Sequence, residues 1–272
     1  MASLEELAQE AEDSGEFERA LKLWRQLASV TSDPIILCRL GSVASQLKKW
    51  QEAEEAFNRA LKLDPSLSLA MECLADLFRS RDDADHAVNL AVAREWLLRA
   101  VKIDKTARAL TVLGATCAAM GDRDAALDAL SEAIQVNDSY EEAYFNLALL
   151  EKEANPQRAV TMLEKAVELD TNYLEAHQQL GILCQKQRKL LEAEYHFRRC
   201  VEIDPADYWA LLYLANNLAV QGHSGTAEER FRAAIDLRPD DPTAYEFFAD
   251  WLDENSRSEE ATSVRERLRD LR

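Results

Sequence analysis

Four side chains of the types that bind metal ions lie close together in the sequence: His177, Cys184, His196 and Cys200. Two histidines and two cysteines could hold a tetrahedral zinc ion if all four met at one point. On a helix, however, His177 and Cys184 are separated by about 10 Å along the axis, whereas ligand atoms must lie about 2 Å from one zinc ion. The spacing therefore argues against a metal site, and we expect these residues to occupy ordinary helical positions.

Two further patterns could be taken for sites of chemistry. The segment Gly222-His223-Ser224-Gly225 is rich in glycine, but it lacks the preceding strand that a phosphate-binding loop requires, so we interpret it as a turn between helices. Adjacent carboxylates such as Glu141-Glu142 are common on exposed helix faces, and they mark no general acid or base. We predict no catalytic residue, no metal and no cofactor, and we expect that the chain is not an enzyme.

The composition predicts helix along almost the whole chain. Among 272 residues there are only seven glycines and six prolines, while alanine, leucine, glutamate, arginine and glutamine recur throughout. The 50 acidic and 32 basic side chains give a net charge of -18, which repels nucleic-acid phosphate and anionic lipid. Nucleic acid is therefore not expected as a partner, and a basic protein segment fits this charge better.

The cysteines favour a reducing compartment. The five cysteines are an odd number and include no CxxC pair. They lie in apolar helical segments, which is typical of cysteines that serve as small buried side chains in a reducing compartment. These residues are Cys38, Cys73, Cys117, Cys184 and Cys200. The sequence begins without a basic stretch followed by an apolar segment, and no window approaches eighteen apolar residues. We therefore expect a cytoplasmic location and no insertion into a membrane.

The chain aligns with itself at a period of about 34 residues. The unit that begins at Pro34 has Leu40-Gly41 in its first helix, then Ala53, Phe57 and Ala60 in its second, and ends with Leu63-Asp64-Pro65. The same positions recur as Leu113-Gly114 with Ala126, Leu130 and Ala133, as Leu180-Gly181 with Ala193, Phe197 and Cys200, and as Leu214-Ala215 with Ala227, Phe231 and Ala234. These residues resemble the signature of the tetratricopeptide repeat (TPR) family.

The resemblance implies an all-α, right-handed superhelical solenoid of about eight antiparallel helix-turn-helix repeats. We expect one array over residues 1–272, with approximate units 1–33, 34–67, 68–106, 107–140, 141–173, 174–207, 208–241 and 242–272, the last a cap. The third unit has about six extra residues around 81–90. These extra residues either form a longer loop or helix without a role, or lie at a binding edge.

First helices of TPR proteins line a concave groove, so the resemblance also implies which residues face a partner. The predicted partner-binding residues are Arg108, Val112, Phe145, Asn146, Leu149, Gln178, Gln179, Ile182, Trp209, Tyr213 and Asn216, and the same mapping places Thr111 and Leu212 there. Apolar groups on an open face usually mark an interaction site, and the amides can donate to and accept from a peptide backbone. Alternatively, Trp209 and Leu212 pack between neighbouring first helices.

We therefore expect a protein-protein interaction scaffold that binds a peptide or helix, basic or amphipathic, of a partner protein in this groove. The alternative is self-assembly into homo-oligomers through the groove or the end units. TPR proteins that bind the acidic carboxyl tail of chaperones carry a clamp of lysine, arginine and asparagine. Asn146 stands at one clamp position, but Thr111 and Ala115 precede it and Glu175 and Gln179 follow it, which disfavours chaperone binding.

Overall fold

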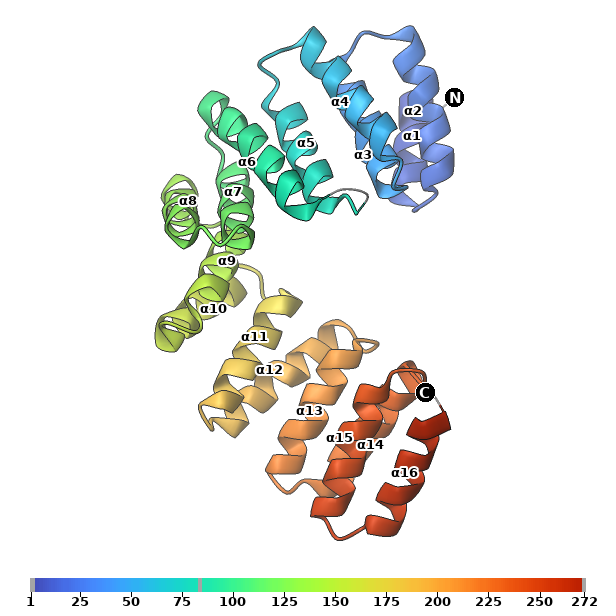
Figure 1. The fold of residues 1–272 in the computed structure, drawn as a ribbon, viewed down its shortest axis with the longest axis vertical. Helices are drawn as coiled ribbons and strands as arrows, with labels where there is room; N and C mark the ends of the chain where they lie inside the picture. Colours follow the sequence, from blue (N-terminus) through green and yellow to red (C-terminus); the bar gives the residue numbers. More distant parts are fainter. Residues whose placement is uncertain (1–2, 83–84, 271–272) are drawn as a thin grey trace. The chain divides into compact units, whose positions relative to one another are not determined.

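The computed structural model describes residues 3–82 and 85–270, and these residues form sixteen α-helices and no strand (Figure 1). Residues 1–150 and 151–272 each form a compact unit and are described separately below. The expectation of one continuous array therefore stays a prediction, while the all-α repeat architecture is confirmed.

In residues 1–150 the helices follow one another in antiparallel pairs joined by short turns. They are α1 (Leu4–Asp13), α2 (Phe17–Val30), α3 (Pro34–Gln46), α4 (Trp50–Leu63), α5 (Ser68–Ser80), α6 (His86–Ile103), α7 (Ala107–Ala119), α8 (Arg123–Val136) and α9 (Glu141–Glu151). Residues 83 and 84, inside the predicted insertion, lie outside the described residues. The rest of the insertion extends α6 to 18 residues, compared with 14 in α4.

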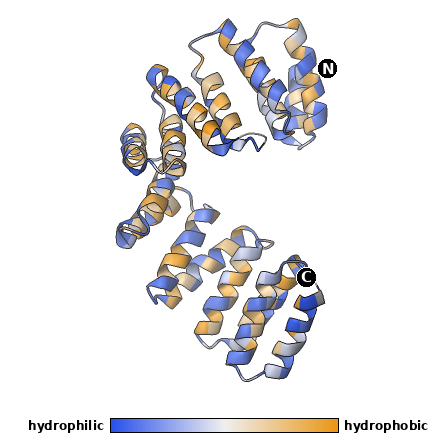
Figure 2. Ribbon diagram, in the orientation of Figure 1, coloured by the Kyte–Doolittle hydropathy of each residue, from blue (hydrophilic) through white to orange (hydrophobic). Residues whose placement is uncertain are grey.

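Residues 151–272 continue the same alternation. Their helices are α10 (Pro156–Leu169), α11 (Leu174–Lys186), α12 (Leu190–Ile203), α13 (Tyr208–Val220), α14 (Ser224–Leu237), α15 (Pro242–Glu254) and α16 (Ser258–Asp270). The first helices α11, α13 and α15 lie side by side and contact one another, and each also packs on the second helix that follows it (Figure 1). Figure 2 shows hydrophobic and hydrophilic residues mixed along these helices, as one-sided burial requires.

Local chemistry sets the helix ends. Proline begins α3 and α15, where its fixed φ suits the first turn and its missing N–H is not needed. Before each proline an aspartate caps the helix: the Asp33 carboxylate accepts from the Ile35 N–H at 2.8 Å, and Asp241 repeats the arrangement. Gly222 has φ +82° and lies between α13 and α14, so the predicted turn is confirmed at Gly222 and His223. Ser224 and Gly225 were wrongly assigned to this turn, because α14 begins at Ser224.

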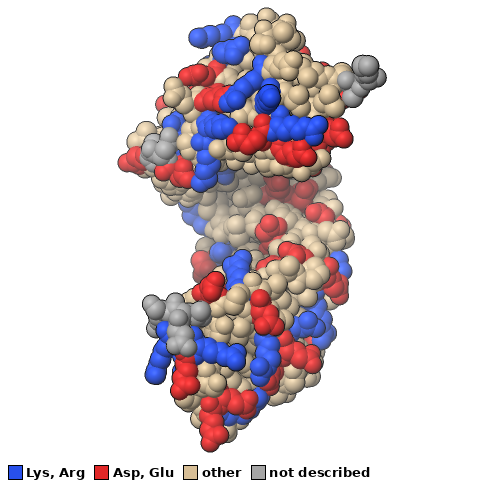
Figure 3. All heavy atoms as spheres, turned by 90° about the vertical axis from the view of Figure 1, so that its right-hand side faces the viewer, with Lys and Arg blue, Asp and Glu red and all other residues tan. Residues whose placement is uncertain are grey.

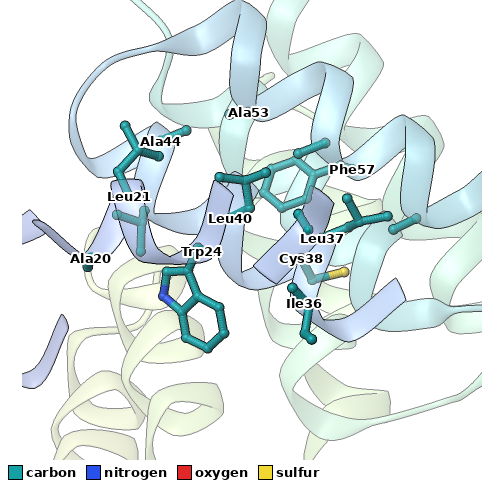
Figure 4. Packing of buried hydrophobic residues seen from close by; sticks show 14 of the residues in the cluster. Ala20, Leu21, Trp24, Ile36, Leu37, Cys38, Leu40, Ala44, Ala53 and Phe57 are labelled. Carbon is teal, nitrogen blue, oxygen red and sulfur yellow. The ribbon is translucent and has the colours of Figure 1, made fainter. Parts of the chain in front are cut away.

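The repeat signature residues form the core. Phe57 is 1% exposed, and Figure 4 shows its ring beside Leu40, with Trp24 of the preceding unit close to them. A Cβ added to Gly41 would lie 2.4 Å from Cε1 of Phe57, so only glycine fits beside this ring. Phe197 and Gly181 repeat the arrangement in residues 151–272 with the same 2.4 Å spacing. A small residue in the first helix thus admits the large residue of the second.

The residues considered for metal binding occupy different contacts. His177 is buried, its Nε2 lies 3.2 Å from the Thr171 carbonyl oxygen, and its Nδ1 lies 3.0 Å from Nδ1 of His196. Cys184 contacts a Glu192 carboxylate oxygen at 3.8 Å, and Cys200 contacts a backbone carbonyl. Among the described residues, no three histidine, cysteine or acidic side chains are grouped closely enough to hold a metal ion. The four side chains therefore do not converge on one point.

The histidine pair should make folding depend on pH. Because the Thr171 carbonyl accepts from Nε2–H of His177, the unprotonated Nδ1 of His177 accepts from Nδ1–H of His196. Burial, and to a smaller extent the neighbouring His177 ring, lower the pKa of His196 to about 4. A histidine with a lowered folded-state pKa contributes stability above its unfolded pKa of about 6.5, and this stability is lost as the pH falls towards 4.

We therefore expect the free energy of unfolding to fall between about pH 7 and about pH 5, as measured by urea unfolding followed by circular dichroism. The variant His196→Gln should show a smaller fall, since it removes the titrating ring. His223→Gln, which changes an exposed histidine in the turn before α14, serves as the control and should behave like the parent chain. An equal fall in the His196→Gln chain would exclude the histidine pair as the cause.

The surface carries charge of both signs. On the face drawn in Figure 3, basic and acidic side chains are interspersed over both units. The five cysteines are unpaired thiols, of which all but the half-buried Cys73 are buried. Within the described part of the chain, no helix has the length and apolar character needed to cross a membrane.

Candidate partner-binding groove

The clearest candidate site lies on the open face of α11, α13 and α15. On α13, Trp209, Tyr213, Asn216 and Val220 are spaced by four, three and four residues, so their side chains share one side of the helix. Trp209 is 38% exposed and Val220 is 49% exposed, and on α15 Phe247 is 40% exposed. These apolar side chains are left in solvent although the helices that carry them are otherwise well packed.

Two adjoining hollows run along this face. The first, of about 400 Å³, is lined by Ile182, Tyr213, Val220 and Phe247 together with charged residues of α11 and the following turn. The second, of about 340 Å³, lies between α13 and α15 and has Trp251 in its wall. Asn216, Val220 and Phe247 line both hollows, so the two form one continuous surface, which we call the α11–α15 groove.

Buried aromatic residues hold the groove in shape. The Tyr213 ring stacks on Phe197 of α12 with centroids 5.5 Å apart, and Trp209 stacks on Tyr213 at 6.1 Å. On α15, Phe248 and Trp251 stack at 5.9 Å. These contacts fix the rings before any partner arrives, which lowers the entropic cost of binding.

A buried hydrogen bond ties the two helices that form most of the groove. The Tyr208 hydroxyl of α13 accepts from the Ala244 N–H of α15 at 3.0 Å, and the Arg238 guanidinium lies over the Tyr208 ring at 4.7 Å from its centroid. Burial raises the pKa of Tyr208, so the hydroxyl stays neutral. The spacing of α13 and α15 is therefore set by a directional bond as well as by packing.

The two ends of the groove differ in charge. Lys186 and Arg188 line the hollow next to α11. Lys186 pairs with Glu153 at 3.7 Å, whereas within the described residues no carboxylate lies within 4 Å of the Arg188 guanidinium. At the other end the wall contains three carboxylates, namely Glu246, Asp250 and Glu254. Asp250 pairs with Arg265 at 3.1 Å, whereas no cation of the described residues lies within 4 Å of the Glu254 carboxylate. The groove thus combines an apolar middle with a basic and an acidic end.

Six of the predicted partner-binding residues lie in residues 151–272, and three of them, Ile182, Tyr213 and Asn216, line the groove. Trp209 lies at the start of α13 and remains exposed while it packs on Tyr213. Gln178 and Gln179 are half-buried on α11, where Lys152 donates to Gln179 at 3.5 Å. Leu212 is 1% exposed, so the alternative that it packs between helices was the right one.

The other five predicted residues lie in residues 1–150. Arg108 donates to the Glu72 carboxylate and, at 3.1 Å, to Asp76, so its charge is already neutralised by α5. Asn146 donates to the carbonyl of Glu142 in its own helix at 2.8 Å.

The remaining residues of this group are apolar or buried. Val112 packs against a buried cluster, and Phe145 and Leu149 are half-buried. Placing Thr111 in the groove was wrong, because it is 2% exposed. Participation of this group in one common groove stays a prediction.

The sequence mapping missed two residues that contribute much of the apolar surface. Phe247 stands at the same repeat position in the last unit as Tyr213 does in the unit before, but that unit was assigned only a capping role. Val220 extends the α13 stripe by four residues beyond Asn216. Both signals are present in the sequence: the repeat register identifies Phe247, and the helical spacing identifies Val220.

An all-α repeat protein with an open groove is the class that this fold and site define. Comparison with family models matches residues 34–67 and 174–207 to the tetratricopeptide repeat. The first match is the unit that shows the signature most fully, and the second contains α11 and α12. The chain therefore contains tetratricopeptide repeats.

Curated relatives are similar over part of the chain. Anaphase-promoting complex subunit 3 of Schizosaccharomyces pombe is 25% identical over 174 residues, 63% of this chain and 25% of that protein. Human protein O-mannosyl-transferase TMTC1 is 28% identical over 182 residues, 65% of this chain and 20% of that protein. The chain therefore spans a quarter or less of the length of these relatives.

Solved structures share the fold. A structure of pilF from Pseudomonas aeruginosa matches with a TM-score of 0.68 and 22% identity, covering 80% of this chain and 97% of that chain. A chain of the APC/C hetero-tetramer Cut9-Hcn1 matches with a TM-score of 0.71 and 15% identity, covering 90% and 48%. At these identities the likeness extends to the helical repeat fold alone.

Proposed function

We propose that this chain is a protein-protein interaction scaffold that binds a short segment of a partner protein in the α11–α15 groove. The observation that carries the proposal is the set of apolar side chains on the open face, above all Val220 and Phe247, which are 49% and 40% exposed. A repeat protein gains no core packing from such exposure. Contiguous apolar groups with a polar rim are typical of binding surfaces.

The groove favours a partner of particular chemistry. Its middle accepts apolar side chains, and Asn216, which lines both hollows, can donate to and accept from a backbone. Glu246, Asp250 and Glu254 favour basic groups at one end, and Lys186 and Arg188 favour acidic groups at the other. We therefore infer an amphipathic segment whose ends carry opposite charge, with its basic end on α15.

The scaffold role requires no chemistry of its own, and any catalysis would belong to a partner. One relative, by its name, is a subunit of a multi-protein complex, which supports an interaction role for this chain. The unpaired cysteines favour a reducing compartment, so we place this binding in the cytoplasm.

The proposal is tested with peptides selected on the purified chain from a displayed library of random segments of about 15 residues. Selected peptides should bind the chain and lose at least about 100-fold in affinity for Tyr213→Ala/Phe247→Ala, because aromatic anchors carry most of the binding energy. The matched control is Leu191→Ala/Tyr195→Ala, which removes two apolar side chains that are 75% and 58% exposed on α12. Circular dichroism verifies that both variants are folded.

Two results would count against the groove. Peptides that bind the Tyr213→Ala/Phe247→Ala chain as tightly as the parent would place recognition elsewhere. Light scattering that reports growth with concentration, abolished by the same two substitutions, would assign the groove to a second copy of the chain instead of a partner.

A further inference from the structure

A separate hollow of about 560 Å³ lies in residues 1–150, between the second helices α4 and α6. Three cationic side chains line it: Arg59 and Lys62 from α4, and Arg99 from α6. Leu61, Pro65 and Trp96 supply an apolar wall. This hollow has no part in the α11–α15 groove, which is built entirely from residues 151–272.

The three cations of this hollow form no ion pair with a described residue. No carboxylate of the described residues lies within 4 Å of the charged nitrogens of Arg59, Lys62 or Arg99, although the chain has a net charge of -18. Nearby arginines are paired, as Arg25 is with Glu52 at 2.6 Å. Positive charge left uncompensated in an acidic protein indicates a site for an anion.

The repeat register brings the two guanidinium groups to one place. Arg59 and Arg99 each follow the signature alanine of their helix, Ala53 and Ala93, by six residues, so they occupy the same position in successive units. In two units of residues 151–272 the residue at this position forms an ion pair within its own helix, Lys165 with Glu168 at 3.0 Å and Arg199 with Glu202 at 2.5 Å. Arg59 and Arg99 form no such pair with a described residue.

The side chains are held in part by their surroundings. The Arg99 guanidinium lies over the Trp96 ring, 4.2 Å from its centroid, and Arg59 donates to the Ala28 carbonyl at 3.5 Å. The one carboxylate in the wall belongs to Glu55, and it accepts from the amide of Gln51 at 3.1 Å. Each guanidinium has five N–H donors, so these contacts leave donors available for an incoming oxyanion.

We propose that this hollow binds a phosphate monoester carried on the side chain of a peptide, such as a phosphorylated serine. A phosphate monoester brings close to two negative charges and three acceptor oxygens, which matches two guanidinium groups and an ammonium better than a single carboxylate does. The wall of Leu61, Pro65 and Trp96 offers apolar contact to the flanking peptide. The overall negative charge opposes an extended polyanion such as nucleic acid, but it opposes a single phosphorylated residue much less.

The test uses immobilised pools of degenerate peptides with phosphoserine, serine or glutamate at the central position. The phosphoserine pool should retain at least about tenfold more of the purified chain than either other pool, since charge-assisted bonds to a dianion are the strongest available. Inorganic phosphate in excess should displace the bound chain, whereas chloride at equal ionic strength should displace less. In nuclear magnetic resonance spectra, the indole N–H signal of Trp96, assigned with Trp96→Phe, should shift as the phosphoserine pool is added.

Variants with the same change in net charge distinguish binding in the hollow from a general effect of the charge of the protein. Arg59→Gln/Arg99→Gln should lose about tenfold or more of the binding to the phosphoserine pool, whereas Lys22→Gln/Lys48→Gln, an equal change in net charge at two exposed lysines outside the hollow, should retain it. Equal retention of the phosphoserine and glutamate pools, equal loss in both variants, or an unmoved Trp96 signal would each overturn the proposal.

Discussion

Replacing Phe197 by alanine should lower the free energy of unfolding by about 3–5 kcal/mol, because a fully buried ring is removed and the surrounding helices close the cavity only in part. Phe197 is 0% exposed and lies beneath Tyr213, whose ring stacks on it at 5.5 Å. The same change should therefore also weaken peptide binding in the groove. Urea unfolding and a peptide titration of the folded fraction measure the two effects.

The matched control is Tyr195→Ala, which removes an aromatic ring from the same helix two residues earlier. Tyr195 is 58% exposed, so its loss should change the free energy of unfolding by no more than about 0.5 kcal/mol. Similar losses in the two variants would mean that Phe197 does not anchor the packing of α11, α12 and α13. Unchanged peptide binding by folded Phe197→Ala would mean that the ring does not support Tyr213.

Gly181→Val should cost about 3 kcal/mol, because extra methyl groups in a tightly packed core force neighbouring side chains out of their preferred rotamers. Even a single Cβ at this position would lie 2.4 Å from Cε1 of Phe197. The substitution places added volume where two helices are closest, so the first and second helix of the unit must separate. Thermal and urea unfolding measure the loss.

A second glycine gives the control for helix propensity. Gly225 is also helical, but a Cβ added there meets no atom within 4 Å, so Gly225→Val should change stability by about 0.5 kcal/mol or less. Replacing the Phe197 ring by the smaller leucine side chain, in the double variant Gly181→Val/Phe197→Leu, should recover part of the free energy of unfolding that Gly181→Val loses. No recovery in that double variant would contradict the steric explanation.

The fold could be predicted from the sequence because the same pairing of a small residue in the first helix with a large residue in the second recurs from unit to unit. The pairing of Gly41 with Phe57 recurs as Gly181 with Phe197, and each pairing dictates how closely two helices approach. Repetition converts a weak local pattern into a strong one. The extension of α6 was less predictable, because extra residues can enter a helix or a turn at similar cost.

The binding face was harder to predict, because the position of a residue in the repeat indicates which way its side chain points but does not indicate which residues it contacts. The repeat register predicted Tyr213 as a partner-binding residue, and Tyr213 lines the α11–α15 groove. The register also predicted Arg108 as a partner-binding residue, but Arg108 is paired with Glu72 and Asp76. Thr111 was misplaced for a related reason, since a neighbouring helix covers it. Ion pairs and burial between helices depend on residues about 30 positions away in the sequence. Assigning residues from their position within one helix does not take these distant residues into account.

The hollow at Arg59 and Arg99 had no signal of its own in the sequence. Lysine and arginine are frequent on exposed helices, and Arg59 and Arg99 are forty residues apart in the sequence. Their significance comes from the lack of an ion-paired carboxylate among the described residues, which only the arrangement of α4 and α6 reveals. Whether a charged side chain is paired depends on residues that are far apart in the sequence, whereas the repeat signature can be recognised along the sequence itself.

Photo-crosslinking from inside the groove tests the central claim most directly. A benzoylphenylalanine introduced at position 220, on the open face of α13, should crosslink to the selected peptides, and unlabelled peptide should suppress the reaction. The same group at position 191, on the exposed face of α12, should give little crosslinking although Leu191 is 75% exposed. Crosslinking from position 191 with none from position 220 would contradict the assignment of the α11–α15 groove as the binding surface.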